Sequence, residues 1–371
     1  MPDSIIPQKV LADGIVAQAL SQPTSEEEKR AERLAVLEAT RITTATEVEP
    51  EAYSLSVDGV GIFALGDVHG LKGKQKSGKS AVLKVCAAAL LCGQQFRVKA
   101  ELEDSLTVFI DTEQQAADVK LIVDELQQMT QCPDEYIDQH LRLYTLRRMS
   151  YDSLLSDTRL LIETHHPQVV FIDGLVDYVA SFNDEVMSRE LIHELLLICE
   201  EYHCAIVNVL HENKATDDEN MRGHLGTVLA QKSGTVLQCQ KNKKSGIISV
   251  TCPDSRHGAM PQWSIGFDAD GHLYDADQQH RLELQEKRER KQAAKKAERE
   301  LILQQRLSIA LSILAANGGC MLRTDLTKQL VAQTQLDRST ISRFITAMVK
   351  GGKLYESNKS VMSTPQIACP F

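Results

Sequence analysis

Aromatic residues are scarce in this chain of 371 residues: they make up 5% of it, and one of them is its single tryptophan. Hydrophobic residues still account for 43%, which is enough to build a substantial core. We therefore expect a core of aliphatic side chains, mainly Leu, Val, Ile and Ala. The length suits one large α/β domain together with one small domain.

Positive charge is also in short supply. The 51 acidic residues outnumber the 41 Lys and Arg residues, which gives a net charge of −10. This balance excludes a protein that coats nucleic acid with its whole surface, although local basic patches remain compatible with it.

The nine cysteines include no C-x-x-C pair and no metal-ligand spacing with histidine. Those in apolar runs are expected to be small buried thiols, as in a reducing cytoplasm. They are Cys86, Cys92, Cys199, Cys204 and Cys239. The first residues lack a basic-then-apolar leader, and no apolar run approaches the length of a membrane span. The sequence thus predicts a cytoplasmic protein with no membrane partner.

The most informative motif is Gly-Lys-Gln-Lys-Ser-Gly-Lys-Ser at 73–80, which fits the phosphate-binding pattern G-x-x-x-x-G-K-[ST]. Its glycines let the backbone curl so that N–H groups point at anionic oxygens. Lys79 supplies a charge for the β- and γ-phosphates, and the Ser80 hydroxyl can ligate Mg²⁺. We expect ATP and Mg²⁺ as cofactors. The expected binding residues are Gly73, Lys76, Ser77, Gly78, Lys79, Ser80 and Ala81.

The flanks of this motif favour a phosphate loop over an ordinary Gly/Lys-rich surface loop. An apolar segment at 60–65 is predicted to be the strand before the loop. The segment 80–91 is predicted to be the helix after it, with its N-terminus aimed at the phosphates.

Residues 51–275 alternate between strand and helix patterns and are predicted to form the ATPase domain. The predicted strands lie at 105–111, 141–146, 168–173 and 204–210, and the helices between them at 114–129, 151–165 and 185–201. Such repeats indicate an α/β fold with a mostly parallel sheet and helices on both faces. Later segments at 236–240, 246–251 and 263–267 predict antiparallel edge strands.

Three further regions flank this domain. Residues 1–50 are predicted to be an N-terminal extension with a helix from about Thr24 to Arg41, serving as a cover or an inter-subunit arm. Residues 276–305 are dense in charges of both signs, which predicts a solvated helical linker, with nucleic-acid contact as the less favoured interpretation.

The third region, 306–371, is predicted to be a small winged helix-turn-helix domain. Helices are expected at about 301–316, 323–335 and 337–350, followed by a two-stranded wing. From residue 306 onward, eight Lys and Arg residues against three acids give 8 − 3 = +5. This reversal of sign favours docking on DNA, with a protein-interaction module as the alternative. The groove-facing residues would be Arg338, Ser339, Thr340, Ser342 and Arg343.

Two acidic residues at strand ends complete a candidate hydrolytic site. Asp173 ends an apolar strand and would hold Mg²⁺ together with Ser80. Glu113 ends the segment Phe-Ile-Asp-Thr-Glu at 109–113 and would orient the attacking water. Asp111 competes for that role, or it caps the following helix.

The phosphate loop, Phe-Ile-Asp-Thr-Glu at 109–113 and Val-Val-Phe-Ile-Asp-Gly at 169–174 together resemble the RecA-type ATPase core. The sequence is most similar to the hexameric branch, the DnaB-like replicative helicases and plasmid RepA-type ATPases, over about residues 55–270. The resemblance implies that Glu113 is the catalytic base. It also implies a polar γ-phosphate sensor after the next core strand, with His211 as first choice and Asn213 as second.

The resemblance further implies an active site formed between subunits of a homo-oligomer. DnaB-like proteins carry a Lys-x-Arg pair in an edge hairpin, and Lys241 and Lys243 match it by position. The missing arginine is a departure, because lysine lacks the bidentate fork. Arg256 or Arg222 is therefore the alternative for a cation that reaches the neighbouring nucleotide. The segment 221–229 matches the family's central DNA-binding loop by position, although it has a single arginine.

The resulting hypothesis is a hexameric, DNA-associated ATPase, a helicase-type motor in replication or mobilisation of DNA such as mobile elements. Its partners would be DNA and possible replication or recombination proteins. The alternative is an ATP-dependent switch that regulates recombination or transcription without unwinding. A non-hydrolysing scaffold is disfavoured, because the four hydrolytic positions are intact: Lys79, Ser80, Glu113 and Asp173.

Overall fold

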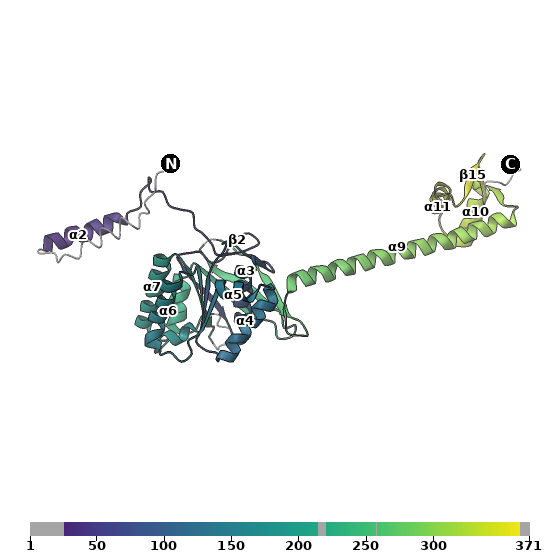
Figure 1. Cartoon of the computed structure of the whole chain (residues 1–371). Helices are drawn as coiled ribbons and strands as arrows, with labels where there is room; N and C mark the ends of the chain where they lie inside the picture. Colours follow the sequence, from purple (N-terminus) through teal and green to yellow (C-terminus); the bar gives the residue numbers. More distant parts are fainter. Residues whose placement is uncertain (1–25, 214–219, 257, 364–371) are drawn as a thin grey trace.

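A nine-stranded sheet organises the larger part of the protein (Figure 1). The computed structural model describes residues 26–213, 220–256 and 258–363. The strand order is β13-β12-β11-β10-β3-β9-β8-β6-β7. The strands from β10 to β7 pair in parallel, and β11, β12 and β13 add antiparallel pairs at one edge. The prediction of a mostly parallel α/β sheet with antiparallel edge strands is confirmed.

The bounds of the sheet strands follow the predicted alternation closely except at β3 and at β13, which was not predicted. They are β3 (Val68–Gly73), β6 (Thr107–Asp111), β7 (Leu141–Thr145), β8 (Val169–Asp173), β9 (Ala205–His211), β10 (Thr235–Lys241), β11 (Ile248–Ser255), β12 (Trp263–Phe267) and β13 (Leu273–Asp275). Strands β6 and β8 are buried along their whole length, as expected for the centre of a parallel sheet.

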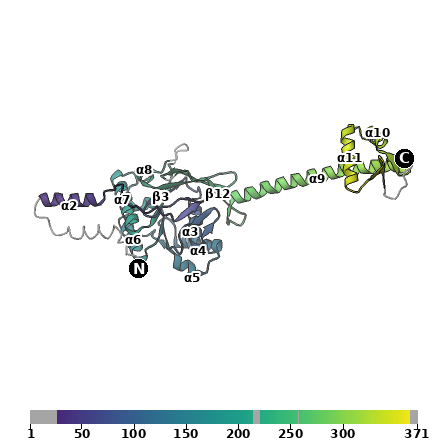
Figure 2. The same ribbon diagram turned by 90° about the horizontal axis from the view of Figure 1, so that it is seen from above.

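Helices cover both faces of the sheet, so the core has two layers (Figures 1 and 2). On one face lie α3 (Lys79–Cys92), α4 (Ala116–Thr130) and α5 (Asp134–His140); on the other lie α6 (Tyr151–His165), α7 (Glu185–Tyr202) and α8 (Gly223–Lys232). The period-2 alternation of strands decides which side chain enters which layer. In β6, Phe109 packs with α3 and α4, whereas Val108 and Ile110 pack with α6 and α7.

The strand that leads into the phosphate loop differs from the prediction. It is β3, over 68–73, and the predicted strand at 60–65 contributes only the two-residue β2 (Val60–Gly61). Strand β3 was not recognised in the sequence because His69 and Lys72 interrupt its apolar pattern. Both residues are nevertheless buried. His69 is accommodated because its Nε2 lies 2.9 Å from the carbonyl oxygen of Ala64.

A second, four-stranded sheet was not predicted. Its order is β2-β1-β5-β4, with β1 (Leu55–Val57), β4 (Gln94–Gln95) and β5 (Val98–Ala100), and all of its pairs are antiparallel. These strands have two or three residues each, too few for a periodic signal. The 3-10 helix η1 (Leu175–Tyr178) after β8 was missed for the same reason.

One continuous helix, α9 (Ala276–Ala316), replaces the predicted linker and the separate helix at 301–316 (Figure 1). No glycine or proline interrupts it, which explains its 41 residues. Its first part is exposed, and its last turns bury Ala310, Ile313 and Leu314.

Those last turns belong to a C-terminal unit with its own core (Figure 2). The unit consists of β14 (Cys320–Leu322), α10 (Arg323–Thr334), α11 (Arg338–Lys350), β15 (Tyr355–Ser357) and β16 (Ser360–Met362). The strands form an antiparallel sheet in the order β14-β16-β15. In α11, Ile341, Phe344 and Ile345 are buried. The domain boundaries drawn from the sequence stay predictions.

N-terminal to β1, the chain forms α2 (Glu26–Ala39), coloured purple in Figure 2. This helix has no buried residue. The predicted start of this helix, at Thr24, lies outside the described residues. No helix among the described residues has the length and apolar character needed to cross a membrane.

One of the five cysteines expected to be buried thiols is exposed: Cys92, at the C-terminal end of α3. Cys320, which was not among the five, is disulfide-bonded. Cys86, Cys199, Cys204 and Cys239 are buried thiols, as predicted.

Candidate nucleotide-binding site

The phosphate-binding loop runs from the end of β3 to the start of α3. Gly78 precedes the helix with φ of 97°, a backbone conformation that residues with a side chain rarely adopt. Ala81 lies buried in the first turn of α3, and Lys76 is exposed in the loop. The helix therefore begins with its unpaired N–H groups at the loop, as an anion site requires.

Lys79 is folded back onto the loop. Its Nζ donates to the carbonyl oxygens of Gly73 at 3.1 Å and Lys74 at 3.2 Å. The residue is 6% exposed. Burial lowers the pKa of Lys79, and the nearby acidic groups Asp173, Glu113 and Glu212 oppose that shift. An ammonium held by two backbone carbonyls can turn to an incoming phosphate without a large change in the fold.

Gly73 and Ser77 shape the inner wall of the loop. A Cβ at Gly73 would lie 2.4 Å from Ser77 Oγ and 2.6 Å from the carbonyl oxygen of Cys239, so only glycine fits there. Ser77 Oγ is buried and has no hydrogen-bond partner within the part of the chain that the structure describes. A buried hydroxyl in this state is expected to meet a ligand oxygen.

Ser80 and Asp173 come together as the sequence predicted. Ser80 Oγ donates to Asp173 Oδ2 at 3.1 Å, from the first turn of α3 to the end of β8. Burial raises the pKa of Asp173 to about 6, and the neighbouring Asp111 and Glu113 add to the shift. Three carboxyl groups therefore lie near one another beside the Ser80 hydroxyl, with Lys79 as the opposing charge, and such an oxygen-rich site favours a divalent cation.

Asp111 and Glu113, the two candidates for orienting the water, differ in burial and in hydrogen bonds. Asp111 is fully buried, and its Oδ1 accepts from the N–H groups of Glu113 at 3.0 Å and Gln114 at 2.7 Å. Its Oδ2 accepts from Gln114 Nε2 at 2.6 Å. Asp111 thus caps the turn after β6 and fixes the backbone at Glu113. Glu113 is exposed, but partial desolvation and the negative charges of Asp177 and Asp111 raise its pKa.

His211 ends β9 beside the loop. Its Nδ1 lies 3.0 Å from Lys79 Nζ. Burial, together with the charges of Lys79 and Arg222, lowers the pKa of His211, so the neutral ring can accept from the lysine. The Arg222 guanidinium lies over the Phe182 ring, 4.4 Å from its centroid, and the backbone N–H of Arg222 donates to the carbonyl oxygen of His211. Glu113, Phe182, His211 and Arg222 line one small cavity.

The other predicted cations lie at opposite ends of the strands. Cys239 in β10 pairs with Gly73 in the parallel strand β3, so Lys241 and Lys243 lie at the same end of the sheet as the phosphate loop, and both are exposed. Lys241 Nζ lies 5.6 Å from the Phe267 ring centroid. Arg256 lies at the opposite end, where its Nη2 donates to the carbonyl oxygen of Lys232 at 2.8 Å.

Two polar residues near the loop, Glu212 and Gln238, were not identified from the sequence. Glu212 directly follows β9 and is 6% exposed, and its Oε1 accepts from Gln238 Nε2 at 2.8 Å. The backbone carbonyl of Asn213, the second choice for the sensor, accepts from Lys74 Nζ at 2.6 Å. A charged residue just past an apolar strand gave a signal, but nothing in the sequence indicated its burial.

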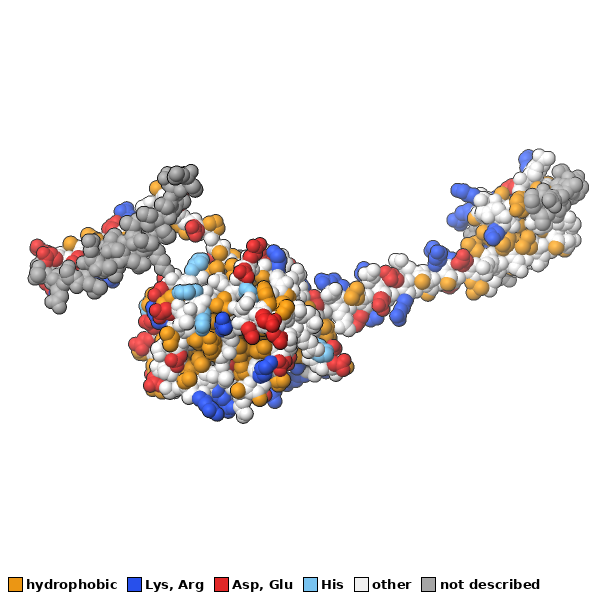
Figure 3. Space-filling view, viewed as in Figure 1, with side chains coloured by type: hydrophobic (Ala, Val, Ile, Leu, Met, Phe, Trp, Pro, Cys, Tyr) orange, Lys and Arg blue, Asp and Glu red, His pale blue; other side chains and the backbone are white. Residues whose placement is uncertain are grey.

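The predicted groove residues lie on α11 of the C-terminal unit. Arg338, Ser339 and Arg343 are exposed, whereas Thr340 and Ser342 are half-buried. The carboxylate of Asp337 accepts from the hydroxyls and backbone N–H groups of Ser339 and Thr340, which lowers its pKa. Capping thus engages those two hydroxyls and leaves the arginines outward. Lys and Arg side chains gather on the face of this unit seen in Figure 3.

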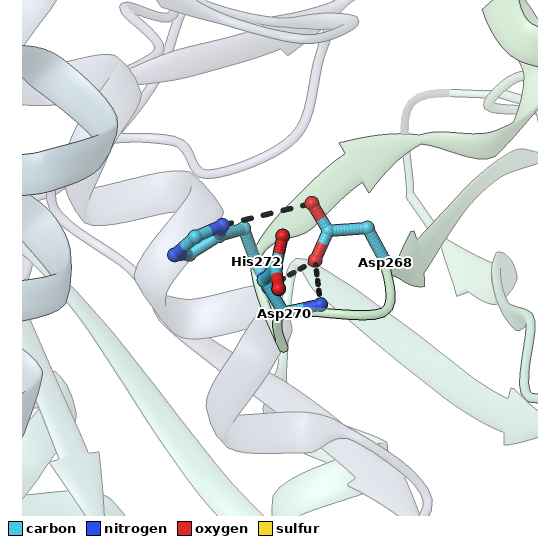
Figure 4. Close-up of side chains that lie close together, drawn as sticks. All are labelled: Asp268, Asp270 and His272. Carbon is cyan, nitrogen blue, oxygen red and sulfur yellow. Dashed lines mark hydrogen bonds and ion pairs between the residues drawn. The ribbon is translucent and has the colours of Figure 1, made fainter.

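A cluster outside the loop, Asp268, Asp270 and His272, has ligand atoms close enough for a metal ion (Figure 4). Asp268 Oδ1 accepts from the N–H groups of Asp270 at 3.0 Å and His272 at 2.8 Å. All three residues are exposed. The turn between β12 and β13 therefore accounts for the cluster by itself.

A family described as an AAA domain matches residues 30–217. A search of curated proteins gives no match. Among solved structures, the RadB recombinase is 14% identical with a TM-score of 0.43, over 58% of this chain and 93% of that one. A KaiC-like protein from Pyrococcus horikoshii OT3 is 15% identical with a TM-score of 0.43, over 61% of this chain and 99% of that one.

The fold and the loop define an α/β protein of the P-loop class. Because the family match spans more than half of the 371 residues, the chain belongs to the AAA domain family.

Proposed function

We propose that this protein binds ATP with Mg²⁺ and hydrolyses it. The observation that carries the proposal is the contact between Ser80 Oγ and Asp173 Oδ2, at 3.1 Å and next to the buried ammonium of Lys79. A hydroxyl, a carboxylate and a lysine in this arrangement are the parts of a magnesium–triphosphate site.

The residues of the loop fit such a ligand. Ser77 has a buried hydroxyl that lacks a partner among the described residues, and Gly73 leaves no room for a side chain. The N-terminus of α3 would hold the phosphates, and Ser80 with Asp173 would hold the metal ion. Bound Mg²⁺ would neutralise phosphate charge and polarise the phosphoryl group that is transferred.

Three side chains would act around the phosphates. Glu113 would orient a water molecule and accept its proton, a role that its raised pKa favours. Lys79 would leave the carbonyl oxygens of the loop and stabilise charge on the phosphates. His211 would act as the γ-phosphate sensor: its Nδ1 lies 3.0 Å from the Lys79 ammonium, so a movement of Lys79 to the phosphates would change this contact.

The protein would work as a homo-oligomer, most simply a hexamer of the RecA type. Lys241 and Lys243 lie on the edge of the sheet that carries the phosphate loop, where an edge hairpin can reach the nucleotide of a neighbouring subunit. Arg256 is already bonded at the far edge, which makes it the weaker choice.

DNA would be the macromolecular partner. The C-terminal unit has a capped helix, α11, with Arg338 and Arg343 exposed, and a hairpin beside it. This order of elements suits a winged helix that docks on duplex DNA. A DnaB- or RepA-like motor in replication or mobilisation of DNA combines these features.

A second candidate function is an ATP-dependent switch on DNA that regulates recombination or transcription without unwinding. The net charge of −10 favours it, because a translocating ring needs basic loops along its channel. Release of a labelled strand from a duplex separates the two, since only a helicase displaces the strand.

The deciding experiment is ATP hydrolysis measured without DNA, with single-stranded DNA and with duplex DNA, using Lys79→Ala as the blank. Stimulation by single strands supports the motor, and stimulation by duplex alone supports the switch. Absence of hydrolysis in all three conditions contradicts both and leaves a nucleotide-dependent scaffold.

A further inference from the structure

Glu212 is a buried carboxylate at the edge of the phosphate loop, with 3% of its side chain exposed. Burial of a carboxylate is costly unless partners stabilise its charge. Gln238 Nε2 donates to its Oε1 at 2.8 Å, and Lys74 Nζ lies 3.9 Å from its Oε2. The charge is thus held by an amide from β10 and by a lysine of the loop itself.

The position of Glu212 links three strands. Strand β3 lies between β9 and β10, so the bond from Glu212 to Gln238 spans the end of β3. The N–H of Glu212 also donates to the carbonyl oxygen of Gly73 at 3.1 Å. This residue therefore fastens the first turn of the loop to both neighbouring strands.

Lys74 is the second residue of the loop, and its ammonium is held over the end of β9. It donates to the carbonyl oxygen of Asn213 at 2.6 Å, with Glu212 as the nearby counter-charge. A negative charge beside an anion-binding loop opposes phosphate binding. Glu212 thus has two effects. Its negative charge repels the phosphates, and it holds the Lys74 ammonium, which could otherwise bind them.

We propose that Glu212 is a positioning residue that holds Lys74 over β9 and so limits how tightly the site binds nucleoside di- and triphosphates. The inference rests on the proposed nucleotide binding. When Glu212 is neutral, Lys74 loses its buried counter-charge and turns to the phosphates. The repulsive charge disappears at the same time, and both changes tighten binding.

The test measures the dissociation constants of ATP and ADP by calorimetry for the full chain, Glu212→Gln, Lys74→Ala and the double variant. Glutamine keeps the acceptor for Gln238, so the packing is preserved. We expect Glu212→Gln to lower both constants roughly three- to tenfold at low salt and less at high salt. In the Lys74→Ala background the gain should fall by at least half. Glu185→Gln, an exposed pair with Arg189, is the matched control and should change neither constant.

Weaker binding by Glu212→Gln, or an equal gain in both backgrounds, overturns the proposal. A purely structural role would instead lower the unfolding temperature and weaken binding regardless of Lys74. If Glu212→Gln does not fold, Lys74→Gln must weaken the binding of both nucleotides roughly threefold, because Glu212 then faces the phosphates without the ammonium of Lys74. Wild-type protein that does not bind ATP overturns the proposed function as well, whereas binding with no effect of Glu212→Gln overturns this inference alone.

Discussion

Ser80 Oγ donates a hydrogen bond of 3.1 Å to Asp173 Oδ2, which joins the first turn of α3 to the end of β8. These residues are 93 positions apart in the sequence. In the sheet, β9 lies between β3, which leads into the loop before Ser80, and β8, which ends at Asp173. The contact forms because the carboxyl ends of parallel strands share one edge. A metal ion at this place would replace the proton of the hydrogen bond.

Asp173→Asn should stabilise the protein in the absence of metal and nucleotide. Burial raises the pKa of Asp173 from 3.8 to about 6, so the folded state binds its proton more tightly than the unfolded state. Stability therefore falls as pH rises from about 4 to 6, and the loss is complete above that range. At pH 8 the variant should gain about 1 to 3 kcal/mol.

Thermal unfolding in EDTA across this pH range measures the effect. Wild type should lose stability with rising pH, whereas the variant should show a flatter profile. Asp118→Asn, an exposed residue of α4, serves as the control. Added Mg-ATP should reverse the order, because only wild type binds it well. A variant that is less stable than wild type in EDTA at pH 8 contradicts the assignment.

Glu113→Gln should abolish turnover and keep nucleotide binding. Loss of a general base typically costs 10²- to 10⁴-fold in rate, and we expect a decrease of about that size in kcat. The dissociation constant of ATP should change little, because no hydrogen bond or ion pair among the described residues joins the Glu113 side chain to the phosphate loop, and its charge acts on Lys79 only through space. Single-turnover hydrolysis and calorimetry provide the two readouts, with exposed Glu103→Gln as control. Equal loss of binding and turnover would show that Glu113 has a structural role.

Asp177→Asn should move the acidic limb of the pH–rate profile to lower pH. The negative charge of Asp177 helps to raise the pKa of Glu113, so its removal lowers that pKa and leaves the base ionised in more acidic solution. Asparagine can still accept from Thr112 Oγ1, as Asp177 does at 2.7 Å. The profile of kcat/KM for wild type and variant is the measurement. An unchanged acidic limb would argue against Glu113 as the titrating group.

Much of the candidate site could be predicted from the sequence because each residue follows a local pattern. Glu113, Asp173 and His211 all stand at the ends of apolar strands, and parallel pairing brings such ends together. Glu212 and Gln238 escaped prediction, since their contact depends on burial across β3. The residues next to Glu212 and Gln238 in the sequence do not distinguish them from exposed polar residues.

The main sheet was predictable for a similar reason, but β3 was not. A buried histidine and a buried lysine within that strand break the apolar pattern, and only tertiary contacts explain them. The length of α9 was underestimated because its charged first part and apolar last part look like two helices. Periodicity reports which face is buried, and it changes along α9 where packing begins.

Gly78→Ala should weaken nucleotide binding and destabilise the fold. Its φ of 97° strains any side chain, and a Cβ there would lie 2.3 Å from Ile248 Cδ1. Gly93→Ala is a matched control, because Gly93 has φ of 85° and nothing within 4 Å of the added atom. We expect about 1 kcal/mol of destabilisation for the control and about 1 to 3 kcal/mol more for Gly78→Ala. Chemical unfolding measures both, and equal losses would show that Ile248 yields freely.

Arg338→Ala and Arg343→Ala should weaken binding of duplex DNA without regard to its sequence. Both arginines are exposed on α11, and Arg343 is held near the helix start by contacts with Ser339 and Thr340. An arginine that contacts a phosphate releases a counterion, so each variant should reduce the slope of log K against log salt by about 1. Fluorescence anisotropy at several salt concentrations measures the slope, and exposed Arg290→Ala on α9 is the control. An unchanged slope in both variants, with the control behaving alike, would assign α11 to protein contacts and favour an interaction module over a DNA-binding one.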